Sequence, residues 1–375
     1  MPSIGQITEL AKKVRNIFLS RNLFLFYGFL DMRYFFSLYQ AGSSSIVIVP
    51  EYIAHSPVLR DAIGGERIIA IRKLPHLGHP EPKGRARYFH YLELFLVKVK
   101  LWLFTLLVSN KATAYFFNDF SVYLNFVLIS ALRRRKNQMF WIDAMPWLKT
   151  EASPMELVAS RGPGFQKYLR VLSRIVGERI IEAQYRPREA KNGDAGAPCQ
   201  VTAVGHALAD PLPEKKIALL SWPEIKQKFG LRDFSPGEKA VLVIETPFDP
   251  YWPKVDAQET YARTAAYLDA ALEPDAKIHF KLHYSNPDTN HFAGTIVEDR
   301  VSLLPHSVPA ELYVISYDRV YFFMSSSILA PTQARLFSLS RLIEFEEEKE
   351  RQRYFSTYNT IFKDHPGHIE MISDE

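Results

Sequence analysis

The chain has 375 residues, of which 47% are hydrophobic and 23% are charged, and its formal net charge is +5. This is the composition of an ordinary folded protein, and the length favours two domains over a single core. The modest positive charge argues against a nucleic-acid partner, and the only cysteine, Cys199, excludes an internal disulfide and a cysteine metal cluster.

Short apolar runs alternate with helical patterns through the first half of the chain. We expect strands at 22–27, 44–49, 67–71, 112–117 and 138–142, and helices at 30–40, 87–108 and 120–134. Repeated strand-then-helix order of this kind predicts a parallel sheet with helices on both of its faces.

One segment of this half, residues 92–108, is apolar enough to raise the question of a membrane span. It contains Glu93, Lys98 and Lys100, and it is shorter than the roughly 20 residues that a span requires. We interpret it as a buried or amphipathic helix, which is compatible with peripheral contact with the inner membrane. The single cysteine and the lack of a signal-peptide pattern favour a cytoplasmic location.

Turn-forming residues between 192 and 237 indicate the domain boundary, which we place near residue 236. Within this stretch we expect a strand at 201–205 and a helix at 222–229. The second half repeats the first, with strands at 240–244, 277–282, 301–304 and 319–323 and helices at 257–271 and 339–353. The predicted domains are 1–236 and 237–345, and the tail 346–375 continues the last helix or packs back on the first half.

Asp143 follows the predicted strand at 138–142, in the sequence F-W-I-D-A-M-P-W. A carboxylate at a strand end beside Trp141 and Trp147 can serve as a general base, because apolar neighbours raise its pKa. The alternative is an acid that caps a helix or lies in a loop. Asp119, which follows the strand at 112–117, is the reserve candidate.

Three further motifs follow strands of the second half. His283 ends K-I-H-F-K-L-H, where it can donate to a phosphate or protonate a leaving group, or can be an ordinary polar residue at the sheet edge. Ser325, Ser326 and Ser327 open a predicted helix and offer an anion site, or merely cap that helix. Glu311, in Pro-Ala-Glu-Leu, can accept hydrogen bonds from ribose hydroxyls or favour a helix dipole.

The order strand-His, Pro-Ala-Glu-Leu, strand-Ser-Ser resembles the bacterial sialyltransferases and capsule polysialyltransferases. The stretch Y-F-F-N-D-F-S, a helix, and F-W-I-D-A extend the resemblance over about 200 residues, from about Thr113 to Ser327. The chain departs from the family where Tyr284 replaces the proline after the histidine, and where Asp143-Ala144-Met145 replaces an acidic pair and glycine.

This resemblance implies a GT-B fold, with two Rossmann-like doubly wound domains facing a central cleft. It also implies an inverting, metal-independent transfer of sialic acid or a related acidic sugar from a CMP-sugar to a glycan or glycolipid acceptor at the cell surface. Asp143 is then the base, His283 assists the departing phosphate, Ser325–Ser327 hold that phosphate and Glu311 binds the ribose. No metal or other cofactor is expected.

Two alternatives remain open on the sequence alone. The chain can be a GT-B transferase that uses a UDP- or GDP-sugar, with Glu311 and the serines in similar roles. It can also be a non-catalytic protein that binds a polysaccharide or anchors an assembly at the inner membrane, which the aromatic and basic first third favours.

Overall fold

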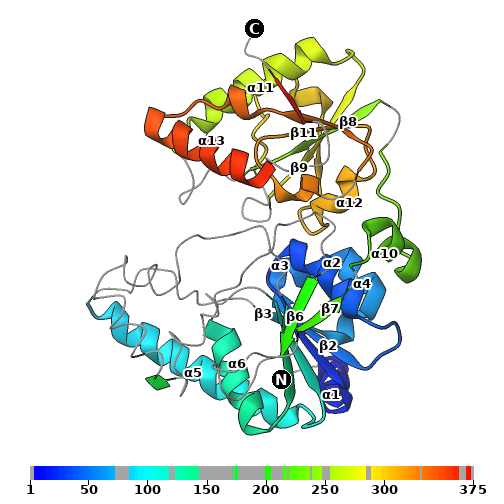
Figure 1. Cartoon of the computed structure of the whole chain (residues 1–375), viewed down its shortest axis with the longest axis vertical. Helices are drawn as coiled ribbons and strands as arrows, with labels where there is room; N and C mark the ends of the chain where they lie inside the picture. Colours follow the sequence, from blue (N-terminus) through cyan, green and yellow to red (C-terminus); the bar gives the residue numbers. More distant parts are fainter. Residues whose placement is uncertain are drawn as a thin grey trace. The chain divides into compact units, whose positions relative to one another are not determined.

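The structure is a computed structural model that describes residues 4–71, 84–117, 123–142, 171, 174–175, 199–203, 214–217, 219–236, 239–246, 254–283, 289–329, 332–362 and 369–372. The chain forms two compact units, and the division lies between Leu220 and Ser221. We call the part up to Leu220 unit 1 and the part from Ser221 unit 2 (Figure 1).

Unit 1 contains a seven-stranded sheet in the order β3-β2-β1-β4-β5-β6-β7. The first five strands in chain order are parallel, whereas β6 and β7 are antiparallel at one edge. The strands are β1 Asn22–Leu25, β2 Ser45–Pro50, β3 Ile68–Ile71, β4 Thr113–Phe117, β5 Gln138–Ile142, β6 Cys199–Ala203 and β7 Glu214–Ile217.

Helices of unit 1 cover both faces of this sheet. Side chains alternate between the two faces along each strand, so apolar strand residues pack against helices on both sides. Leu23 and Leu25 of β1 share a core with Ile17 and Leu128, which belong to helices on one face. On the other face Phe24 packs edge-on against Phe35 at 5.0 Å. The helices are α1 Ile4–Leu19, α2 Phe29–Leu38, α3 Glu51–Ala54, α4 Pro57–Ile63, α5 Ala86–Leu107 and α6 Tyr123–Arg134, with a 3₁₀ turn, η1, at Gly65–Arg67.

Unit 2 contains a six-stranded sheet that is parallel throughout, in the order β10-β9-β8-β11-β12-β13. The strands are β8 Ala240–Ile244, β9 Lys277–Lys281, β10 Val301–Leu304, β11 Arg319–Phe322, β12 Arg335–Ser338 and β13 Ile369–Met371. The helices are α10 Trp222–Phe229, α11 Ala257–Ala271, α12 Ala310–Val314 and α13 Glu348–Phe362, with 3₁₀ turns η2 Glu298–Arg300, η3 Ser326–Leu329 and η4 Ser340–Leu342.

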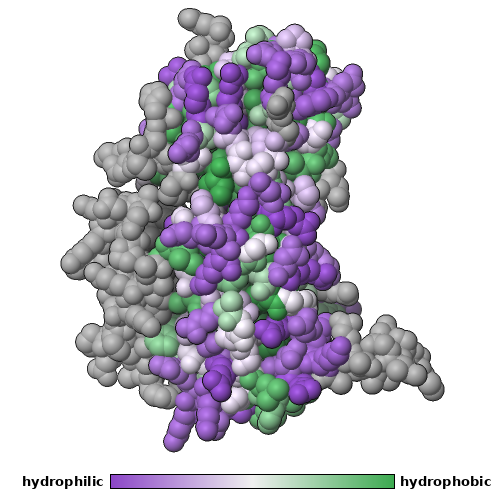
Figure 2. Space-filling view, turned by 90° about the vertical axis from the view of Figure 1, so that its right-hand side faces the viewer, coloured by the Kyte–Doolittle hydropathy of each residue, from purple (hydrophilic) through white to green (hydrophobic). Residues whose placement is uncertain are grey.

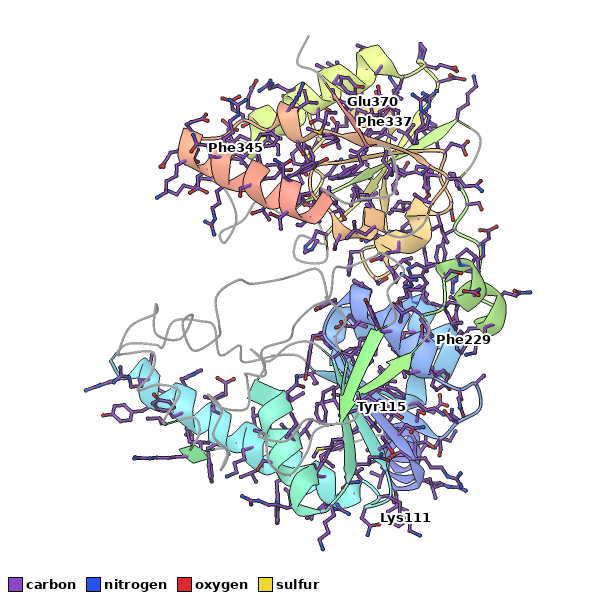
Figure 3. All side chains as sticks on the ribbon, viewed as in Figure 1. Lys111, Tyr115, Phe229, Phe337, Phe345 and Glu370 are labelled. Carbon is purple, nitrogen blue, oxygen red and sulfur yellow. The ribbon has the colours of Figure 1, made fainter. Side chains whose placement is uncertain are left out.

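Both sheets have the Rossmann strand order. Counted from the first strand of each unit, the order is 3-2-1-4-5-6, with one further strand, β7, at the edge of unit 1. The expected α/β class with two Rossmann-like, mostly parallel sheets is therefore confirmed. Figure 3 labels Phe337 and Glu370, which are register partners on β12 and β13 at the far edge of the second sheet.

The end of the chain differs from the sequence-based expectation of a helix over 339–353. The strand β12 occupies Arg335–Ser338, and α13 begins only at Glu348. All four residues from Leu336 to Leu339 are buried. The run therefore lacks the alternation of apolar and polar residues that would have indicated a strand, and β12 was missed. Acidic residues Glu348 and Glu350 in the first turn favour a helix start at the observed position.

The last residues belong to unit 2, whereas the sequence led us to expect a tail that continues a helix or packs on the first half. β13 pairs with β12, and the hydroxyl of Tyr354 on α13 donates to the carbonyl of Phe323 at 2.7 Å. The ring of Phe362 lies 5.7 Å from that of Phe322. Strand pairing and ring packing thus both attach the tail to the second sheet.

Unit 2 starts with α10, whose local sequence explains its bounds. Ser221 caps the first turn, because the Glu224 amide donates to its hydroxyl at 3.4 Å and its own amide donates to the Glu224 carboxylate at 2.6 Å. Gly230 ends the helix with a φ of 60°, which glycine adopts without strain. The boundary expected near 236 thus falls after a helix that groups with unit 2.

The surface of the described residues is mostly polar on the side that Figure 2 shows, with smaller hydrophobic patches between hydrophilic residues. Among the described helices, none combines the length and the apolar character that crossing a bilayer requires.

Candidate functional site

The carboxyl ends of β8 and β11 are adjacent in unit 2, at the point where the strand order reverses. Doubly wound sheets bind ligands in the crevice outside this switch point. Thr246 joins the two strand ends: its hydroxyl donates to the carbonyl of Met324 at 2.7 Å and accepts from the Met324 amide at 3.0 Å. The chain just before the three serines is therefore held beside the end of β8.

Glu245 organises the same edge between β8 and β9. Its side chain is buried, and its amide donates to the carbonyl of Lys281 at 3.0 Å. Its carboxylate accepts a hydrogen bond from the amide of His283 and lies 2.9 Å from Nε2 of His291. One carboxylate thus positions the backbone of His283 and the ring of His291.

His283 lies where the sequence pattern places it, two residues after the end of β9. Burial lowers the pKa of its imidazole to about 4, against the opposing effect of the Glu245 charge and with a smaller contribution from Lys281. At neutral pH the ring is therefore uncharged. In that form it offers one N–H donor and one acceptor, whereas proton transfer to a leaving group requires the imidazolium form.

Lys281 is the buried cation of this edge. Burial lowers its pKa to about 8, while the charges of Glu311 and Glu245 oppose that shift. Its ammonium donates to the carbonyls of Leu282 at 2.9 Å and His306 at 3.3 Å. Lys281 thus ties the end of β9 to the loop before α12, and it stays mostly protonated at neutral pH.

Glu311 lies in the first turn of α12 and is only 5% exposed. Its negative charge favours the protonated form of Lys281. The carboxylate is therefore largely buried, and its charge acts on the lysine. The role in ribose binding remains a prediction.

Ser325, Ser326 and Ser327 follow β11 as the sequence pattern predicts, but they open a short 3₁₀ turn, Ser326–Leu329, and not a helix. The amide of Ser327 donates to the hydroxyl of Ser325 at 3.3 Å, and all three serines are half-buried. A four-residue turn has only a small helix dipole. An anion that binds here would therefore be held by hydrogen bonds from the serine hydroxyls and from single backbone amides.

Glu245 and His291 were missed in the sequence. The signal for Glu245 was its place directly after the apolar strand A-V-L-V-I, which is the position that singled out His283. His291 has no such signal, because it is held by tertiary packing. Its ring stacks on Tyr261 of α11 at 4.5 Å with an interplanar angle of 5°.

The corresponding edge of unit 1, after β1, is also fixed by side chains. The carboxylate of Asp31 accepts from the amides of Tyr27 at 3.2 Å and Gly28 at 3.0 Å. The hydroxyl of Tyr27 donates to Asn125 of α6 at 2.5 Å, and Tyr52 donates to the Tyr27 carbonyl. This network sets the backbone that follows β1.

Both candidate bases, Asp143 and Asp119, lie outside the described residues. Within the part of the chain that is described, no three His, Cys, Asp or Glu side chains are grouped so as to hold a metal ion.

No protein-family model matches the sequence, and no curated protein matches it. Several solved structures are similar to this chain in the course of their backbone. The ADP-heptose LPS heptosyltransferase II of E. coli is 12% identical, with 85% of this chain and 84% of that chain covered and a TM-score of 0.36.

Two other similar structures come from different transferases. The spinosyn rhamnosyltransferase SpnG is 12% identical over 95% of this chain and 87% of its own, with a TM-score of 0.37. Trehalose-6-phosphate synthase OtsA is 10% identical over 92% of this chain and 96% of its own, with a TM-score of 0.39. Likeness at this level leaves the reaction open. None of the three is a sialyltransferase, so that part of the resemblance gains no support.

Proposed function

We propose that the chain is a glycosyltransferase whose nucleotide-sugar donor binds at the carboxyl edge of the unit 2 sheet. The observation that carries this proposal is the joined switch point, where Thr246 holds the chain after β11 and Glu245 holds the backbone of His283. In Rossmann sheets this edge is where nucleotides bind.

A nucleoside diphosphate sugar is the donor that we propose first. The CMP-sugar hypothesis let His283 either stabilise or protonate the departing phosphate, and it placed the serines at the start of a helix. The lowered pKa of His283 argues against protonation, and the short 3₁₀ turn argues against the helix start. The E. coli heptosyltransferase is named for ADP-heptose, which belongs to the nucleoside diphosphate class.

In the proposed reaction an acceptor hydroxyl oxygen forms a bond to the anomeric carbon of the sugar. The bond between that carbon and the phosphate oxygen breaks, and its electron pair stays on the phosphate. Asp143 takes the hydroxyl proton, as the sequence resemblance implies. Neutral His283 and the serine hydroxyls donate hydrogen bonds to the phosphate, which stabilises the charge that develops there.

The experiment is a thermal-shift panel of UDP, GDP, ADP and CMP on the full chain, followed by sugar-release assays with the corresponding donors. A ligand at a hundredfold its Kd adds about 2.7 kcal/mol of stability, which raises Tm by roughly 5–10 °C for a unit of this size. We expect a nucleoside diphosphate to give the largest shift. A larger shift with CMP would restore the CMP-sugar hypothesis.

Two variants separate an enzyme from a binding protein. His283→Ala should reduce the shift caused by the nucleotide, and Asp143→Asn should keep that shift but abolish sugar transfer. If none of the nucleotides stabilises the chain and no donor is consumed, the proposal is wrong.

A further inference from the structure

The long helix α5 of unit 1 exposes a broad apolar face. Phe89, Leu92, Leu96, Val99, Trp102 and Leu103 have between 36% and 73% of their surface exposed. At 100° per residue these side chains, together with Tyr88, Phe95, Leu106 and Leu107, fall within a sector of about 140°. Exposed apolar residues scattered singly are ordinary, whereas a continuous face of this width marks an interaction surface.

The opposite face of α5 attaches the helix to unit 1. Leu94 and Thr105 are buried, and Leu101 and Phe104 pack against the core that α6 also covers. Figure 3 shows several side chains of α5 projecting away from the rest of unit 1. The exposed face is thus not the one by which the helix is held.

The charges around this face are almost all positive. Between residues 84 and 111 the chain carries five basic residues and one acidic residue, Glu93. The basic residues are Arg85, Arg87, Lys98, Lys100 and Lys111. A wide apolar face with basic residues beside it is the pattern of helices that lie in the surface of an anionic bilayer.

The end of α1, which packs against α5, repeats the pattern. Phe18 is 65% exposed and Leu19 is 53% exposed, and the sequence of this helix carries three basic residues, Lys12, Lys13 and Arg15, against one acid, Glu9. Two neighbouring helices therefore present the same chemistry.

The width of the apolar face of α5 favours a bilayer over a second copy of the chain as its binding partner. A helix that pairs with another helix needs only a narrow seam at two positions of every seven. The face of α5 is far wider than that seam and is rich in aromatic residues. Like positive charges on two copies would also repel each other.

We propose that α5, with the end of α1 beside it, docks on the surface of a bilayer that contains anionic phospholipid. The apolar face enters the boundary between headgroups and acyl chains, and the exposed basic side chains Arg87 and Lys100 contact the phosphates, whereas Lys98 donates to the carbonyl of Ile175. This inference goes beyond the proposed function, because it requires neither a nucleotide nor the unit 2 site.

The test is flotation of the full chain, without nucleotide, with vesicles of phosphatidylcholine alone or of phosphatidylcholine mixed with phosphatidylglycerol. We expect binding to the mixed vesicles that weakens as salt is raised. The triple change Phe89→Ser, Leu96→Ser and Leu103→Ser should reduce the partition coefficient more than about tenfold. The pair Arg87→Glu and Lys100→Glu should reduce binding to the anionic vesicles only.

The matched control is Ile296→Ser with Leu303→Ser in unit 2, whose side chains are 67% and 44% exposed. This variant should bind vesicles as the parent chain does, and circular dichroism should show that all variants are folded. The proposal is overturned if no vesicle binds the chain, or if the control loses binding equally. It is also overturned if the parent sediments as a dimer that the triple change makes monomeric while vesicle binding is unchanged.

Discussion

Burial sets the chemistry of the residues at the unit 2 edge. The sequence predicted His283 at a strand end, and the structure has it there. Its protonation was not predictable, because the pKa depends on the groups that β8 and β9 bring around the ring. The pKa of Lys281 likewise depends on the charge of Glu311, which lies 30 residues later in the chain.

Replacing Glu245 by Gln should destabilise the chain. The buried carboxylate accepts from the His283 amide and lies at hydrogen-bond distance from His291, and a glutamine keeps only one acceptor oxygen. We expect a loss of about 1–3 kcal/mol in the free energy of unfolding, measured with urea. The exposed Glu347→Gln serves as control, and an equal loss there would contradict the assigned role.

The lowered pKa of His283 predicts a specific loss of stability in acid. Between about pH 6.5, where an unfolded histidine titrates, and about pH 4, the unfolded chain holds a proton at this position that the folded chain lacks. Stability should therefore fall as the pH is lowered through this window, by up to about 1.4 kcal/mol per pH unit from this group.

The variant His283→Ala should flatten that dependence in urea titrations between pH 4 and 6.5. Part of the slope will remain, because burial also lowers the pKa of His279. A slope identical to that of the parent chain in His283→Ala would refute the burial effect.

At the scale of elements, predictions succeeded where the periodic pattern and the end signals agree. The helix α10 was predicted at its observed bounds, since Ser221, Pro223 and Gly230 mark its ends. The strand β12 was missed because its buried run does not alternate between apolar and polar residues, and β13 was missed because three residues give too short a pattern. β13 lies at the edge of the sheet, where β12 is its pairing partner.

The capping box of α10 can be tested separately. Ser221→Ala removes the hydroxyl that accepts from the Glu224 amide, so this amide of the first turn loses its hydrogen-bond acceptor. We expect a loss of about 0.5–2 kcal/mol in the free energy of unfolding by thermal or urea denaturation. Ser235→Ala, also outside the core, provides the comparison, and a neutral result for Ser221 would show that the cap contributes nothing.

At the scale of the whole molecule, the repeated strand order in the two units is the main result. The sequence predicted two parallel-sheet halves from the alternation of strands and helices, and the structure has both. The division at Leu220–Ser221 was harder to predict, because turn-rich residues extend to both sides of α10. The base expected at Asp143 remains a prediction, as it lies outside the described residues.

The most direct measurement is hydrogen exchange of the full chain by mass spectrometry, with and without the nucleotide that raises Tm most. If the donor binds at the joined switch point, amides at 245–246, 282–283 and 324–327 should exchange more slowly when the nucleotide is present. Slower exchange confined to unit 1, or unchanged exchange at all three strand ends of unit 2, would contradict the proposed donor site.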